Sequence, residues 1–246
     1  MESAPEQGKG RTQVTTFPQN ATAVLVHGAW ADGSCWTNVI APLKREGLNV
    51  ICAPIPLSSL TDDIAALGRA LERAKGPVVL AGHAYGGAVI AAGSDHKVKS
   101  LVYVSALAPD EGETVANVFY RDEPHPEAPK LAPDKHGYLW LAEEGFSKAV
   151  AHKASSEQTS VMEAIQRPIS IHCIQQPALI PAWKSKPTWY LLAEEDRMIN
   201  PKTQRFMAER MGATIRSVRA DHSPMYTEPK FVTGIILEAA RATFTR

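Results

Sequence analysis

Hydrophobic and polar positions follow two different periods along the chain. Short apolar runs rich in β-branched residues predict buried strands, and they fall at 22–28, 47–55, 76–82, 98–106, 187–196 and 213–220. Between them, helical spacing of apolar residues and helix start signals predict helices over 61–75, 85–94, 200–212 and 228–244. Strands that alternate with helices predict an α/β fold, with a mostly parallel central sheet and helices on both faces.

Residues with capping preferences mark the ends of two predicted helices. Thr61 or Asp62 is expected to cap the helix over 61–75, because a short oxygen-bearing side chain accepts a hydrogen bond from the first free N–H groups. Asn200 and Pro201 are expected to begin the helix over 200–212, and Gly212 to end it.

The segment 110–182 breaks the alternation. It is rich in proline and charge at first, then helical in pieces, and no strand-like apolar run occurs before residue 187. One interpretation is a long surface excursion. We favour a helical lid inserted late in the chain, because excursions of this length in compact domains are often functional. The core is then formed by 21–109 and 183–246.

Composition and charge exclude several classes of protein. Lys plus Arg and Asp plus Glu each number 26, so no basic field predicts nucleic acid or a membrane surface as a partner. No apolar run reaches the roughly 20 residues of a membrane-spanning helix. Residues 1–20 are polar and lack the apolar core of a secretory signal, so they are expected to form a flexible tail. Three scattered cysteines predict neither a disulfide framework nor a metal site, and a cytoplasmic location is expected.

The six residues "GHAYGG" follow the third predicted strand and begin a helix. A strand, a G-x-x-x-G turn and a helix in this order are typical of a nucleophile elbow, in which the glycines relieve clashes around a strained central residue. Gly82 and Gly86 occupy the two glycine positions. The central residue is Ala84, which has no nucleophilic atom.

Two backbone N–H groups beside this turn are candidate donors to an oxyanion. The first predicted strand ends in "HGAW", and the loop after such a strand donates one N–H of an oxyanion hole in proteins with this elbow. Ala29 is the expected donor in that loop. The second expected donor is the N–H of Tyr85, directly after the elbow.

An acid and a histidine follow in the order that this constellation requires. Asp196 lies at the end of the predicted strand 187–196, and His222 lies in the loop after the strand 213–220. A carboxylate can orient an imidazole that acts as a base. The order of elbow, acid and histidine along the chain is that of the α/β-hydrolase elbow proteins.

From about residue 21 to its end, the chain resembles the α/β-hydrolase superfamily. The motifs that carry the resemblance are "HGAWADGSCW", "GHAYGGAVI", "LVYVSALAPDEGET", "EDRMINP" and "DHSPM". The closer similarity is to the small-esterase branch that includes plant methyl esterases and hydroxynitrile lyases. The resemblance implies ester hydrolysis without a cofactor on a small-molecule substrate, with Asp196 and His222 as acid and base. The chain departs from the family at Ala84, where a serine is usual.

Ala84 leaves three interpretations open. In the first interpretation, Ala84 is an engineered change of serine to alanine in an ordinary esterase. Alternatively it is natural, and the His222–Asp196 pair carries lyase or cofactor-free oxygenase chemistry or activates water directly. In the third interpretation, the protein is a non-catalytic pseudo-hydrolase that binds a small ligand. Ser34, Cys35 and Ser223 lie near the motifs but not on the elbow, so none of them is expected to replace the nucleophile.

Aromatic residues on the motif loops and in the lid predict the character of the pocket. Trp30, Trp36 and Trp140 are expected to line an apolar, aromatic cleft that suits a small apolar or aromatic ester. An apolar surface on the lid is compatible with a homodimer.

Overall fold

The fold is seen in a computed structural model that describes residues 17–244. Its centre is a sheet of six parallel strands in the order β2-β1-β3-β4-β7-β8. The strands are β1 (Thr22–Val26), β2 (Asn49–Ala53), β3 (Val78–His83), β4 (Val98–Val104), β7 (Thr188–Ala193) and β8 (Thr214–Val218). Five lie within a predicted apolar run and β3 extends one residue beyond its run, to His83; the α/β prediction with a mostly parallel sheet is confirmed.

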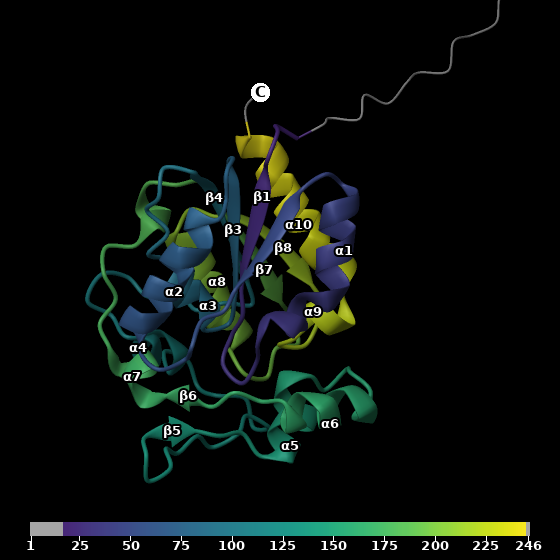
Figure 1. The fold of residues 1–246 in the computed structure, drawn as a ribbon. Coiled ribbons are helices and arrows are strands. Elements are labelled where there is room, and N and C mark those ends of the chain that lie inside the picture. The colour runs from purple at the N-terminus through teal and green to yellow at the C-terminus, as the bar shows by residue number, and fades with distance from the viewer. Residues whose placement is uncertain (1–16, 245–246) are drawn as a thin grey trace, which may run out of the picture.

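Helices cover both faces of the sheet (Figure 1). On one face lie α1 (Thr37–Arg45) and α10 (Pro229–Thr243), and on the other lie α2 (Leu60–Glu72), α3 (Gly86–Ile90) and α8 (Pro201–Arg210). The strand side chains alternate between the two. Val24 and Val26 of β1 pack in the core under α2 and α3, whereas Ala23 and Leu25 pack in the core under α1 and α10. Continuous apolar strands follow from burial on both faces.

The structure corrects one predicted helix start and confirms another. Helix α2 begins after Ser59, whose side chain accepts a hydrogen bond from the N–H of Asp62, so neither Thr61 nor Asp62 is the cap. Helix α8 begins as expected, with the Asn200 side chain accepting from Lys202 and Pro201 in the first turn.

Several short elements were not predicted. The turn η1 (Gly33–Trp36) and helix α1 follow β1, where only Val39 and Leu43 mark the buried face and Pro42 interrupts the pattern. The one-turn helix α9 (Pro224–Thr227) follows His222. Short elements with few apolar positions give little periodic signal.

The segment 110–182 lies across the carboxyl ends of the strands (teal to green in Figure 1), and from here on we call it the inserted segment. Two-residue strands β5 (Tyr138–Leu139) and β6 (Ile169–Ser170) pair in antiparallel fashion within it, where no strand was expected. Its helical elements are α4 (Val115–Phe119), α5 (Glu143–Gly145), the π-helical turn η2 (Phe146–Val150), α6 (Ser156–Ala164) and α7 (Ile171–Gln175). A last turn, η3 (Ala182–Lys184), leads back to β7.

The predicted tail over 1–20 lies mostly outside the described residues, which begin at residue 17. Phe17 packs edge-on against Phe244, with 6.0 Å between the ring centroids. The folded part therefore begins before residue 21, four residues earlier than expected. Among residues 17–244, none of the helices is long and apolar enough to cross a membrane.

Candidate active site

The turn between β3 and α3 has the strained geometry of an elbow. Ala84 has φ +49°, in the left-handed region, which costs a residue other than glycine about 1–3 kcal/mol. The two glycines make the turn possible. A Cβ on Gly82 would lie 2.6 Å from the carbonyl oxygen of Gly86, and a Cβ on Gly86 would lie 2.6 Å from that of Val26. The sharp turn directs the methyl group of Ala84 toward the carboxyl end of the sheet.

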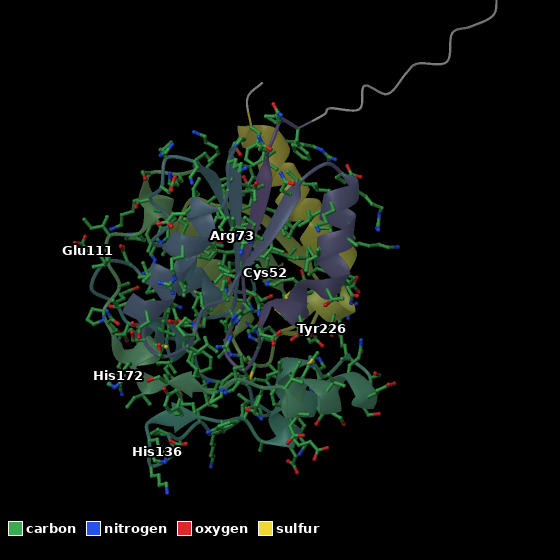
Figure 2. The ribbon with its side chains drawn as sticks, in the orientation of Figure 1. Cys52, Arg73, Glu111, His136, His172 and Tyr226 are labelled. Carbon is green, nitrogen blue, oxygen red and sulfur yellow. The ribbon has the colours of Figure 1, made fainter. Side chains whose placement is uncertain are left out.

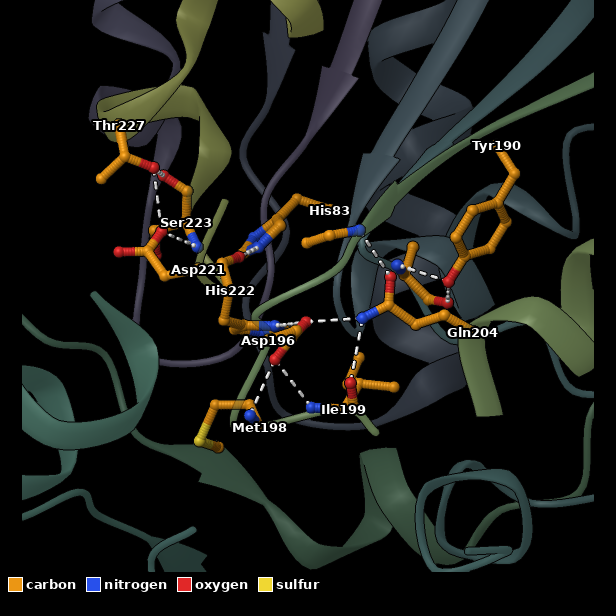
Figure 3. Close-up of polar contacts among 12 residues, drawn as sticks. His83, Tyr190, Asp196, Met198, Ile199, Gln204, Asp221, His222, Ser223 and Thr227 are labelled. Carbon is orange, nitrogen blue, oxygen red and sulfur yellow. Dashed lines mark hydrogen bonds and ion pairs between the residues drawn. The ribbon is translucent and has the colours of Figure 1, made fainter. Parts of the chain in front are cut away.

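His222 and Asp196 form a buried, hydrogen-bonded pair (Figure 3). The distance from Nδ1 of His222 to Oδ2 of Asp196 is 2.7 Å. Oδ1 of the same carboxylate accepts from the backbone N–H groups of Met198, at 2.7 Å, and Ile199, at 2.9 Å. Nε2 of Gln204 donates to Oδ2 at 2.8 Å. Because an ionised carboxylate can only accept, His222 carries its hydrogen on Nδ1, and Nε2 is left to accept a proton.

His83, within the elbow, supports the His222 ring. The two ring centroids are 4.8 Å apart, and Nε2 of His83 lies 2.7 Å from the backbone carbonyl oxygen of His222. The carbonyl accepts, so Nε2 of His83 donates. Burial lowers the pKa of His83 well below its usual value. His83 therefore orients the imidazole and does not compete with it for a proton.

The loop after β1 closes over the elbow. A Cβ on Gly28 would lie 2.8 Å from the Cβ of Ala84, so only glycine allows this approach. Burial lowers the pKa of His27, just before it, to about 4. Trp30 adopts φ +57°, and its indole N–H donates to the carbonyl oxygen of Leu139, at 2.9 Å, in the inserted segment. The loop that contains Ala29 is thus held between the elbow and the inserted segment.

Two cavities meet at the elbow. The larger has a volume of about 250 Å³ and an almost wholly apolar lining from α4, α7 and the loops of the inserted segment. The smaller has a volume of about 50 Å³ and includes the polar side chains of Asp32, Ser34 and Tyr226. Both cavities are lined by the same four residues of the elbow region, namely Ala29, Trp30, Ala84 and His222. A small molecule with its reacting centre at this junction would fill both cavities.

The structure brings most of the expected site residues together and corrects two of them. Trp36 is fully buried under the opposite face of the sheet, in the core with α1 and α10. Trp140 is 54% exposed, and its indole N–H donates to Asp134 on the outside of the inserted segment. Neither of them lines either of the two cavities at the elbow. Sequence cannot separate a pocket tryptophan from a core or surface one, because its contacts depend on tertiary packing.

Gln204 and Asp63 are two buried polar residues that no sequence signal pointed to. Both are fully buried. Gln204 lies on α8 and bonds Asp196, the Ile199 carbonyl and the Ala193 N–H. Asp63 lies on α2 and accepts a 2.6 Å hydrogen bond from the hydroxyl of Tyr85. In a helical pattern such residues resemble the solvated face, so only the tertiary contacts identify them.

The scattered histidines of the inserted segment stay apart. Figure 2 shows His136 and His172 on its outer side, and both are exposed. Within residues 17–244, no group of three or more His, Cys, Asp or Glu side chains is arranged to hold a metal ion.

The arrangement can move a proton at the junction of the two cavities. An imidazole oriented by a carboxylate is a general base and, once protonated, a general acid. Ala29 and Tyr85, the two expected N–H donors, line the larger cavity together with Ala84. What the site lacks is an oxygen or sulfur atom on residue 84 that could form a covalent intermediate.

Comparisons with known proteins agree with this fold. A carbendazim-hydrolyzing esterase from Nocardioides sp. strain SG-4G is 32% identical over 112 residues, which cover 39% of this chain and 46% of that esterase. Methylesterase 2 of Arabidopsis thaliana is 25% identical over 250 residues, covering 88% of this chain and 95% of that protein. Among solved structures, a histidine-to-alanine variant of tomato methylketone synthase I, complexed with β-ketoheptanoate, superposes with a TM-score of 0.78. It is 18% identical in sequence, and the match covers 90% of this chain and 98% of the other.

A model of the alpha/beta hydrolase family matches residues 23–234. This match includes the elbow, Asp196, His222 and, except for Thr22 at the start of β1, all six strands of the central sheet. The chain therefore belongs to the alpha/beta hydrolase family.

Proposed function

We propose that this protein is an enzyme that acts on a small apolar or aromatic carbonyl compound by acid–base chemistry, without a covalent intermediate. The observation that carries the proposal is the complete His222–Asp196 pair beside an alanine. Every oxygen of Asp196 is hydrogen-bonded, and Nε2 of His222 remains available as a base. A histidine–carboxylate pair that lines a pocket, and whose carboxylate is held by four hydrogen bonds, supports a role in proton transfer.

In this proposal the substrate carbonyl lies at the junction of the two cavities. The N–H groups of Ala29 and Tyr85 stabilise negative charge as it develops on the carbonyl oxygen. His222 removes a proton from water or from the substrate and returns it to the leaving group. The reaction is then lyase-like, or it is ester hydrolysis with water as the nucleophile. The inserted segment acts as a lid, because it supplies most of the larger cavity's wall.

Ester hydrolysis through a serine at position 84 is the second candidate. It is favoured by the elbow itself, since Ala84 keeps φ +49° although a methyl group gains nothing from this strain. The names of the two relatives reported above, an esterase and a methylesterase, also support it. In this case Ala84, engineered or natural, is what prevents acyl transfer.

One set of assays separates the two candidates. The chain, Ala84→Ser and His222→Ala are compared on short p-nitrophenyl esters, on mandelonitrile and on a β-keto acid. We expect the unmodified chain to turn over one of these substrates, and His222→Ala to lose about 100-fold or more of that rate, the usual contribution of a general base. Asp134→Asn, on the outer surface, is the control and should leave the rate unchanged.

The other outcomes have distinct meanings. If only Ala84→Ser hydrolyses esters, with a gain of about 1,000-fold or more, the serine-esterase candidate is correct and our proposal is wrong. If neither protein turns over any substrate but both bind small aromatics, the protein is a binding module.

A further inference from the structure

The walls of the two cavities carry no permanently charged cation. Among residues 17–244, no lysine or arginine lines either cavity. Apart from His222, Tyr85, Tyr120 and Gln175, with the Trp30 indole, the larger cavity is lined by apolar side chains and backbone. A ligand carboxylate in it would lose its hydration without gaining a lysine or arginine partner, which is costly.

A buried carboxylate lies directly behind this wall. Oδ2 of Asp63 accepts from the Tyr85 hydroxyl at 2.6 Å and from Sγ of Cys173 at 3.5 Å. Oδ1 accepts from the N–H of Leu57 at 2.7 Å. The Leu57 N–H can only donate, and the Tyr85 hydroxyl and the Cys173 thiol are both able to donate to an ionised Asp63. Burial raises its pKa, and these hydrogen bonds oppose the rise. No arginine or lysine in the described chain forms an ion pair with it.

The smaller cavity has its own negative charge. Asp32 lines it, and the Asp32 carboxylate accepts from the N–H of Ser34 at 2.8 Å. Hydrogen bonding to Ser34 lowers the pKa of Asp32, which keeps the group ionised. Arg167 is the cation that acts on it from a distance, but its guanidinium donates to the carbonyl of Ile55 at 3.2 Å, and it lines neither cavity.

We propose that this pocket selects an uncharged carbonyl substrate and rejects the corresponding carboxylate, and that Asp63 is a specificity-determining residue for this choice. The inference rests on the proposed function, because it concerns the same pocket and names the class of substrate. Esters, ketones and cyanohydrins fit it, and β-keto acids in their ionised form do not. Asp63 acts through its charge, one side chain behind the Tyr85 ring.

Binding of two isosteric ligands tests the charge preference without any turnover. The neutral probe is 3-phenylpropanamide and the anionic probe is 3-phenylpropanoate, each titrated calorimetrically into the full chain at pH 7.5. We expect the amide to bind about 30-fold more tightly or better, since the carboxylate meets desolvation and like charge with no counter-ion. Equal affinities, or tighter binding of the carboxylate, would overturn the inference.

Two adjacent aspartates on α2 provide a matched pair of variants. In Asp63→Asn the carboxylate probe should gain about tenfold in affinity, the effect of one like charge removed at short range. The amide should bind within about twofold of the unmodified chain, which also shows that the variant folds and that its pocket is intact. Asp62→Asn, exposed on the same helix, should change neither affinity, because water and salt screen surface charges. Equal effects of the two variants would contradict the role of Asp63.

A further variant covers the case in which Asp63→Asn does not fold, and the turnover assays separate this inference from the proposed function. If Asp63→Asn does not fold, Asp32→Asn serves instead, because asparagine preserves the cap of η1, and it should also favour the carboxylate. Failure of both probes to bind overturns this inference together with the proposed function. A strong preference for the amide in a protein that turns over nothing supports the inference and contradicts the proposed function alone.

Discussion

At the scale of single residues, burial decides which histidines can carry a charge. Nδ1 of His27 lies 2.9 Å from the carbonyl oxygen of Gly28, and Nε2 has no partner among the described residues. Desolvation is the main reason why the pKa of His27 falls from 6.5 to about 4. His27 is thus kept neutral beside the loop that carries Ala29, at the expense of stability in acid.

Replacing His27 should flatten the dependence of stability on pH. The unfolded chain binds a proton at His27 below about pH 6.5, whereas the folded chain does so only near pH 4, so this contribution is lost as the pH falls through that window. The expected loss between pH 7 and pH 5 is about 2 kcal/mol. Urea unfolding of His27→Phe at both values should show a correspondingly smaller difference. His136→Asn, exposed, is the control, and an unchanged pH dependence in His27→Phe would contradict the assignment.

At the scale of elements, the elbow joins β3 and α3 through contacts that only glycine permits. A Cβ on Gly86 would lie 2.6 Å from the carbonyl oxygen of Val26 and 2.7 Å from that of His27. These atoms belong to the backbone of β1 and the loop after it, so they cannot move without displacing the neighbouring strand. The helix therefore begins so close to the sheet because two of its first residues have no side chain.

Alanine substitutions at two helical glycines should have opposite effects. Gly86→Ala is expected to destabilise the protein by more than about 2 kcal/mol, because the clash is with backbone. Gly68→Ala in α2, where a Cβ would meet nothing within 4 Å, should stabilise it by about 0.5–1 kcal/mol through helix propensity. Thermal and urea unfolding of both variants provide the measurement. If both variants raised the free energy of unfolding, the backbone around the elbow would be able to move enough to accommodate a methyl group at residue 86.

At the scale of the whole molecule, the inserted segment is hydrogen-bonded to the loops after β1, β7 and β8 and to helix α2. These bonds join the α/β core to residues far away in the chain. They are Trp30 to the Leu139 carbonyl, Asp63 to the Cys173 thiol, Arg197 to the Lys148 carbonyl and Asp221 to the Lys153 N–H. These hydrogen bonds therefore fix the position of the inserted segment relative to the loops of the α/β core that line the pocket.

Asp221 offers the sharpest test of this coupling. Its buried carboxylate accepts from the N–H of Ser223, the hydroxyl of Thr227 and the N–H of Lys153. Asp221→Ala should lower the free energy of unfolding by about 3 kcal/mol, roughly 1 kcal/mol for each lost bond.

Hydrogen exchange should show which segments lose amide protection in Asp221→Ala. Amides of both 146–156 and 221–227 should exchange faster in the variant, because the bond joins these two segments. Glu144→Ala, which removes an exposed ion pair with Lys148, should cost no more than about 0.5 kcal/mol. Faster exchange in 221–227 alone would show that the inserted segment is held by other contacts.

The sequence by itself determined the order along the chain of the six central strands and of helices α2, α3, α8 and α10, the position of the elbow, and the order of Ala84, Asp196 and His222. These features depend on neighbouring residues, since strand and helix periods, proline and glycine signals and cap residues act over a few positions. Only the tertiary structure decided which side chains meet. It buried Trp36 under the far face, left Trp140 on the surface and brought Gln204 to Asp196 and Asp63 to Tyr85. Such contacts depend on how the elements pack, and a short stretch of sequence carries no signal for a partner on another element.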